Sequence, residues 1–244
     1  MSNLVQLNLA NHRHLQLEPQ QCAQHGAELN LIPVVMSEFR QLVTQYPILL
    51  TKNGDTGAFT FVAMLGFAKG ENLFWRDHQW HSIYLPLQIR RQPFFVGAKD
   101  AATGEHPLCI DMDSPSISQA PNAVALYSDS GEESDYLLEA KQNLAQLLQG
   151  EADNYDFILL LQELKLLQSL SVEIAFEHAA PTRLNGLYTI DEKQFNNLSD
   201  AQLLRLHRTH FFEPIYMMIA SLGQIYSLID LKNKRSGSGT DHDD

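Results

Sequence analysis

The first half of the chain alternates short apolar runs with turn residues. Residues 48–51 and 58–67 are apolar runs on either side of Asn53-Gly54-Asp55, a sequence typical of a hairpin turn. Residues 94–98 and 108–110 are a second pair of runs around a loop that contains glycine. Runs of this length, bounded by turn residues, predict antiparallel strands joined in a meander.

A short helix is expected between these two strand pairs. Residues 82–92 carry several apolar side chains, with Pro86 early in the segment and Pro93 directly after it. Proline fits the first turn of a helix, where its missing N–H is not needed, and it disfavours helix in the residue before it. We therefore expect a helix that starts near Pro86 and ends before Pro93.

The second half of the chain changes to helical periodicity. Leucines over residues 137–148 have helical spacing, and residues 157–170 are apolar on most faces, which predicts a helix and then a buried central one. Ser199 and Gln202 match a capping box that begins a third helix. Glu213-Pro214 begins the last helix, which is expected to end at about residue 231.

One strand pair is expected within this helical half. Residues 172–176 and 187–190 are strand-like runs around Asn185-Gly186, a turn signal. Strands and helices are therefore segregated along the chain and do not alternate as β-α-β units. This order predicts an α+β protein, with a strand-rich antiparallel N-terminal half packed with a helical C-terminal half.

Composition sets residues 111–135 apart from the rest of the chain. The segment is rich in Ser, Pro, Asp and Glu, so we expect an acidic exposed loop. We favour one domain over residues 1–231 that contains this loop, and two domains divided near it are the alternative. Residues 232–244 are polar and linker-like, and we expect a flexible tail.

Overall composition narrows the class of protein. Of 244 residues, 44% are hydrophobic and 19% are charged, which allows a full core and excludes disorder throughout. Two cysteines, Cys22 and Cys109, cannot build a secreted disulfide framework, and we expect both to be reduced in a cytoplasmic protein. We recognise no signal peptide, and polar residues interrupt the longest apolar stretch, 211–231, so no membrane insertion is expected.

The net charge bears on possible partners. A formal charge of −12 repels phosphate backbones at long range. The two basic clusters, Arg90-Arg91 and residues 232–235, are too short to follow a nucleic-acid groove. We therefore expect no nucleic-acid partner.

Arg90 and Arg91 are the candidates for anion binding. Planar guanidinium groups bind carboxylates and phosphates through paired hydrogen bonds. The alternative is an ion pair within the protein, and adjacent residues on a helix point about 100° apart, so the two need not serve one ligand. Tyr84, just before the pair, and Asp111, after the strand 108–110, complete the ligand-binding candidates.

Metal binding is not expected, although two patterns come close to it. Asp111 and Asp113 follow a predicted strand, but two carboxylates are too few ligands for a dedicated site and also suit a turn. His207, His210 and Glu213 recur at a spacing of three, which would suit zinc on one continuous helix. A proline after Glu213 interrupts that helix. His207, His210 and Asp113 stay the metal candidates.

Four segments, in order along the chain, resemble the SapC family of bacterial proteins. They are Gly70-Glu71-Asn72-Leu73-Phe74; Tyr84-Leu85-Pro86 followed by Arg90-Arg91-Gln92-Pro93-Phe94; Leu108-Cys109-Ile110-Asp111; and the run from Gly186-Leu187-Tyr188 to Leu206-His207-Arg208. The resemblance extends from about residue 4 to residue 231. Through the family's name it implies a role around surface-layer protein or peptide export, and it brings no catalytic residues with it.

Two functions from different classes follow from these observations. The first is a non-catalytic accessory protein that recognises a peptide or protein partner and is linked to peptide or surface-protein export or modification. The alternative is a small-molecule or peptide-modifying enzyme, with an anion-binding pocket at Arg90 and Arg91 and titratable neighbours of shifted pKa. A third interpretation, a structural subunit, predicts a large exposed apolar patch. The sequence has no glycine-rich nucleotide loop and no Gly-x-Ser-x-Gly elbow, and no cofactor is expected.

Overall fold

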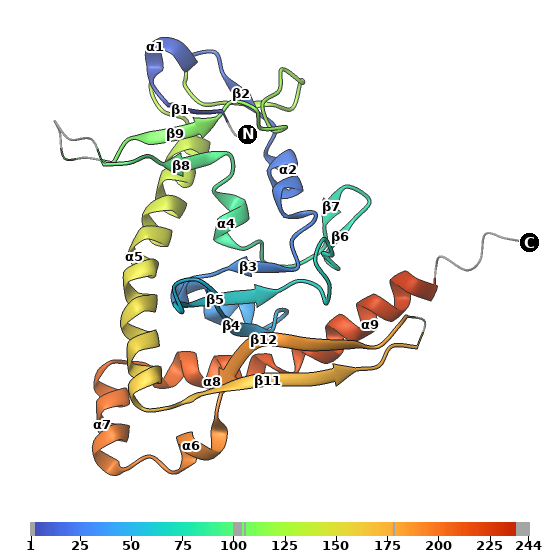
Figure 1. The fold of residues 1–244 in the computed structure, drawn as a ribbon. Coiled ribbons are helices and arrows are strands. Elements are labelled where there is room, and N and C mark those ends of the chain that lie inside the picture. The colour runs from blue at the N-terminus through green and yellow to red at the C-terminus, as the bar shows by residue number, and fades with distance from the viewer. Residues whose placement is uncertain (1–2, 100–103, 105, 178, 238–244) are drawn as a thin grey trace, which may run out of the picture. The chain divides into compact units, whose positions relative to one another are not determined.

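The computed structural model describes residues 3–99, 104, 106–177 and 179–237. Two compact units divide the chain, and each takes up three segments of it (Figure 1). Unit 1 consists of Met1–Ala27, Trp75–His81 and Leu85–Gln149, and unit 2 consists of Glu28–Phe74, Ser82–Tyr84 and Gly150–Asp244. Antiparallel sheets and segregated helices confirm the predicted α+β class. The expected single domain stays a prediction.

Unit 1 contains small antiparallel sheets. Its three-stranded sheet has the order β1-β9-β8, in which β9 is central. The strands of this unit are β1 (Leu4–Gln6), β2 (Gln16–Leu17), β6 (Trp75–Arg76), β7 (Gln79–Trp80), β8 (Phe94–Val96), β9 (Leu108–Asp111) and β10 (Val124–Ala125). The pair β8–β9 confirms the second strand pair predicted from the sequence.

The helices of unit 1 are short, apart from α5. They are α1 (Leu9–His12), α2 (Pro19–Cys22), the 3-10 helix η1 (Ala23–Gly26), α4 (Leu87–Arg90) and the part of α5 (Asp135–Glu163) that ends at Gln149. Pro86 is the N-cap of α4, which confirms a helix that starts there, although it is shorter than expected. The core of the unit joins side chains from β8, β9 and the first turns of α5, among them Phe94, Ile110 and Leu137.

The segment 111–135 is less exposed than its composition suggests. Leu126 is fully buried in the core of unit 1, and Ser114 and Ser116 are also buried. Ser, Pro and Asp indicate turns, and a turn can be packed against a core as long as its polar groups find hydrogen bonds. Here the hydroxyl groups of Ser114 and Ser116 bond to each other over 2.8 Å.

Unit 2 is built on a five-stranded antiparallel sheet with the order β11-β12-β4-β5-β3. Its strands are β3 (Leu31–Pro33), β4 (Ile48–Lys52), β5 (Phe59–Met64), β11 (Leu167–Ile174) and β12 (Thr182–Ile190). The predicted hairpin between β4 and β5 is confirmed. Asn53 closes it, because its side-chain oxygen accepts hydrogen bonds from the backbone N–H groups of Asp55 and Thr56.

The strand pair of the second half differs from its prediction. The chain turns between residues 174 and 182, and Asn185-Gly186 lies inside β12. The pairing register shifts between Leu170 and Val172, and Gly186 has a φ of +75°, so the glycine serves an irregularity of the ladder and not the turn. β11 is an edge strand, and most of its side chains are exposed.

The predicted helices of the second half are partly right. The leucine-rich segments belong to one helix, α5, which ends at Glu163, so the expected helix over 157–170 is wrong beyond that residue. Lys165 has a φ of +55°, which ends the helix and leads into β11. Periodicity could not find this boundary, because the leucines on both sides of it are buried.

The remaining helices of unit 2 follow β3 and β12. They are the 3-10 helix η2 (Met36–Glu38), α3 (Phe39–Leu42), α6 (Glu192–Asn196), α7 (Asp200–Arg208), α8 (Phe212–Ser221) and α9 (Gln224–Gly237). The capping box at the start of α7 is confirmed, since the backbone N–H of Ser199 donates to Gln202 Oε1 over 2.9 Å. Because α9 continues to Gly237, residues 232–237 are helical and not a flexible tail. The rest of the predicted tail lies outside the described residues.

One stretch of the described chain, Phe212–Gly237, has the length and hydropathy of a helix that could cross a membrane. It contains α8 and α9, and it buries Ile215, Met218 and Leu228. Length and composition alone do not separate a membrane helix from a core helix. The absence of membrane insertion stays a prediction.

Close packing of α5 within unit 2 gives a testable prediction at Gly150. A Cβ atom at this position would lie 2.5 Å from the Cβ of Val35. Ala normally stabilises a helix over Gly by about 1 kcal/mol. Overpacking costs about 1–3 kcal/mol, so Gly150→Ala is expected to lower the free energy of unfolding. Urea unfolding monitored by circular dichroism measures the difference.

Gly223→Ala is the matched control for this experiment. Gly223 is exposed, and a Cβ there would meet a backbone oxygen at an ordinary 3.5 Å. We expect this variant to be as stable as the wild type or slightly more so. A Gly150→Ala protein that gains as much stability as Gly223→Ala would contradict the packing argument.

Candidate functional site

Arg90 and Arg91 have different neighbours in unit 1. Nη2 of Arg90 donates to Oε1 of Glu139 over 2.6 Å. Arg91 donates from Nε to Oε1 of Gln88 over 3.0 Å, and its guanidinium lies 4.2 Å from the ring centroid of Phe95. The two arginines therefore do not form one anion-binding fork. The internal alternative describes them better, although Arg90 also lines a pocket.

Tyr84 and Asp111 are also engaged in internal contacts. Tyr84 belongs to unit 2, where its hydroxyl donates to Oε1 of the fully buried Glu38 over 3.0 Å. Asp111 belongs to unit 1, where its Oδ1 accepts hydrogen bonds from the backbone N–H groups of Asn3 (2.9 Å) and Asp113 (3.1 Å). This is the geometry of a carboxylate that caps a turn.

The metal candidates belong to different units. His207 and His210 lie in unit 2 and Asp113 in unit 1. His210 follows the end of α7 with a φ of +61°, so the helical face that would join it to His207 is interrupted. Within the described residues, no group of three His, Cys, Asp or Glu side chains is placed to hold a metal ion.

The structure contains a polar network in unit 1 that the sequence analysis missed. Nε2 of His25 lies 3.1 Å from Oγ of Ser114, which in turn contacts Ser116. The thiol of Cys22 hydrogen-bonds to Ser116 and lies 3.4 Å from the hydroxyl of Tyr136. These residues come from α2, η1, the loop after β9 and the start of α5, and no spacing in the sequence links them.

Burial keeps the groups of this network uncharged. Removal from solvent lowers the pKa of His25, and the charge of Arg91 lowers it further, against the opposing effect of Asp111. Burial likewise raises the pKa values of the Cys22 thiol and the Tyr136 hydroxyl. A neutral imidazole beside a serine hydroxyl has the groups of a base and a nucleophile, but Ser114 is buried, and the network is best described as a structural one.

The lowered pKa of His25 predicts a pH dependence of stability. The unfolded chain binds a proton at His25 near pH 6.5, whereas the folded state binds it at a lower pH. Between these two values the unfolded state holds more protons, so stability falls as the pH is lowered through this window. Urea unfolding of the wild type and His25→Gln from pH 8 down to pH 5 tests this.

In His25→Gln the amide can replace Nε2 in the contact with Ser114. We expect this variant to lose the part of the pH dependence that lies below about pH 6.5, while its stability near pH 8 changes less. Equal slopes for both proteins in this window would show that His25 is not responsible.

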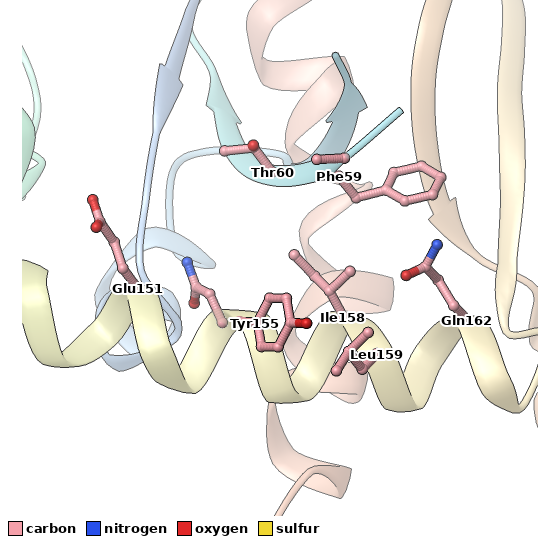
Figure 2. Close-up of a pocket in the computed structure, with 9 residues that line it drawn as sticks. Phe59, Thr60, Glu151, Tyr155, Ile158, Leu159 and Gln162 are labelled. Carbon is pink, nitrogen blue, oxygen red and sulfur yellow. The ribbon is translucent and has the colours of Figure 1, made fainter. Parts of the chain in front are cut away.

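An apolar pocket lies within unit 2, between the second part of α5 and the start of β5 (Figure 2). Its volume is about 310 Å³. Tyr155, Ile158 and Leu159 of α5 form one wall, and Phe59 and Thr60 of β5 form the other. Tyr155 and Leu159 are 64% and 45% exposed.

Neighbouring contacts fix the walls of this pocket. Asn154 is buried at its base, where Nδ2 donates to the carbonyl of Val34 over 2.9 Å and Oδ1 accepts from the N–H of Met36 over 2.8 Å. The ring of Phe59 packs edge-on against Tyr188, with centroids 4.9 Å apart. The pocket is therefore preformed.

The start of β5 offers a sheet edge at this pocket. The pairing of β3 with β5 covers Met64 to Val62, and the last hydrogen bond runs from the N–H of Val34 to the carbonyl of Phe61. Backbone groups of successive residues point to opposite sides of a strand, so those of Phe59 point to the same side as those of Phe61. Among the strands that the structure describes, none pairs with Phe59 on that side.

Sequence reasoning did not single out Tyr155 or Leu159. Leu159 lies in the segment 157–170, whose apolar pattern predicts burial, whereas Tyr155 lies before that segment. The exposure of these two side chains depends on where β3 ends. That position cannot be predicted from the local sequence.

The fold and these pockets define an α+β protein with small cavities among the described residues. A family model described as SapC matches residues 7–228, and the chain belongs to the SapC family. The resemblance stated from the sequence is thereby confirmed. No curated protein and no solved structure matches the chain.

Proposed function

We propose that this SapC family protein is a non-catalytic binding protein that recognises an extended peptide segment of a partner. The apolar pocket with Tyr155 and Leu159 carries the proposal. Its volume of about 310 Å³ suits one large apolar side chain, and its walls are fixed before any ligand arrives. The role in peptide or surface-protein export or modification that the family's name implies would be the setting for such binding.

The backbone next to the pocket supports an extended ligand. A strand added beside Phe59 could use the N–H and carbonyl groups that β3 does not reach. Main-chain hydrogen bonds of this kind give affinity, while a pocket for an alternate side chain gives specificity. One pocket and one open residue on β5 limit the recognised segment to a few residues.

An enzyme with an anion-binding pocket at Arg90 and Arg91 is the second candidate. One observation favours it, since Arg90 lines a pocket of about 270 Å³ together with Cys22 and Tyr136. However, burial raises the pKa values of this thiol and this hydroxyl, so neither is activated as a nucleophile or base at neutral pH. Arg91 bonds to Gln88 and packs on the ring of Phe95. The binding protein therefore has better support.

Peptide selection tests the proposal. A phage-displayed library of random linear heptapeptides is selected on the wild-type protein, and the enriched peptides are synthesised. We expect enrichment of peptides with one large apolar residue. Tyr155→Ala and Leu159→Ala are each expected to weaken binding by about tenfold or more in fluorescence anisotropy, because central apolar anchors dominate interfaces of this kind.

Tyr226→Ala is the matched control variant. Tyr226 is an exposed tyrosine of unit 2 (76%) that lies on α9 and does not line the pocket. Its removal is expected to leave binding unchanged. Peptides that bind all three variants as tightly as the wild type would exclude this pocket. Turnover of a peptide that is lost in Arg90→Ala would favour the enzyme instead.

A further inference from the structure

The pocket of unit 1 at Arg90 has a side-chain amide on its wall. Asn143 on α5 lines this pocket, and the residue as a whole is 6% exposed. Its carboxamide is not among the buried polar groups that lack a hydrogen-bond partner in the described part of the chain, which are Gln92 Oε1 and Thr189 Oγ1. A polar group on the wall of a pocket can fix the orientation of a ligand. The amide presents both a donor and an acceptor to the pocket.

Arg90 and Glu139 stand one helical turn away from this amide. Glu139 precedes Asn143 by four residues on α5, so their side chains are neighbours on one face, with Cβ atoms about 5–6 Å apart. Arg90 is held at this place by its 2.6 Å contact with Glu139. A guanidinium and a carboxamide therefore line the same pocket.

The ion pair can give way to a ligand. The side chains of Arg90 and Glu139 are 35% and 58% exposed, and ion pairs as exposed as this contribute little to stability. An incoming carboxylate can replace Glu139 and accept paired hydrogen bonds from the guanidinium of Arg90. The side chain of Glu139 then points into solvent. The apolar side chains of Leu85 and Ala140 line the same pocket.

We infer that this pocket binds the carboxylate end of an N-acylated amino acid or peptide. The carboxylate contacts Arg90, the adjacent amide group pairs with the carboxamide of Asn143, and the last side chain packs against Leu85 and Ala140. A volume of about 270 Å³ holds one residue with its acyl group. The inference does not rest on the proposed function, because all of these residues belong to unit 1 and the peptide pocket to unit 2.

Titration calorimetry with N-acetyl-L-leucine tests the inference on the full chain. Two analogues each lack one recognised group: N-acetyl-L-leucinamide has no carboxylate, and 4-methylpentanoate has no amide. We expect each to bind at least about tenfold more weakly, which is the effect of losing one or two hydrogen bonds. Absence of binding of N-acetyl-L-leucine up to about 10 mM would overturn the inference.

Variants assign the binding to this pocket. Asn143→Leu is expected to weaken N-acetyl-L-leucine binding at least about tenfold, yet to unfold at about the same temperature as the wild type, because the loss of binding comes from the lost amide and not from unfolding. Asn143→Ala serves if the leucine does not fit. Arg90→Gln is expected to abolish the preference for the acid over the amide, whereas Arg76→Gln, an exposed arginine of the same unit, is expected to change nothing. Binding that survives both Asn143→Leu and Arg90→Gln would overturn the inference.

A comparison of ligands identifies the source of the carboxylate. A pentapeptide that ends in leucine binds more tightly than N-acetyl-L-leucine if the natural ligand is a polypeptide C-terminus, because the preceding residues add contacts at the rim. The reverse order identifies a free N-acyl amino acid. Either order upholds the site, and failure of both ligands leaves the peptide pocket of unit 2 untouched.

Discussion

The carboxamide of Asn154 determines where β3 ends in the sheet of unit 2, and so where the start of β5 is left without a pairing strand. Its two hydrogen bonds take the carbonyl of Val34 and the N–H of Met36, which are groups that a longer β3 would use to continue along β5. β3 therefore ends at Pro33, and the start of β5 faces α5 without an intervening strand. The side chains of Tyr155 and Leu159 stay exposed because of this early departure. One buried amide thus sets the strand length, the pocket and the exposed apolar residues together.

Local patterns predicted much of the fold. The hairpin at Asn53, the capping box at Ser199 and the helix start at Pro86 each depend on residues close in sequence, and all three are present. The ends of helices and strands that lie inside apolar runs were not predicted correctly. The leucines around Lys165 are buried whether the chain is helix or strand, so hydrophobicity cannot locate the end of α5. The Asn185-Gly186 signal was wrong because a glycine with positive φ fits a strand irregularity as well as a turn.

The candidate sites were harder to predict because they depend on tertiary contacts. Arg90, a predicted anion-binding residue, lines a pocket together with Asn143, and Asn143 was not predicted because an asparagine inside a helix carries no local signal. The network at His25 joins residues 89 positions apart. An amide that lines a pocket can be identified only when its neighbours in the fold are known. Both pockets described here place a few polar groups beside an apolar surface.

The two outer strands of the sheet in unit 2 also limit self-association. β3 carries Pro33, which has no N–H to offer to a further strand. β11 is polar over much of its length, carries Glu173 and is distorted by its register shift near Leu170. Features of this kind prevent edge-to-edge pairing between copies of a protein. Strand addition is thereby discouraged along these two edges, so the sheet does not favour polymerisation of the protein through them at high concentration.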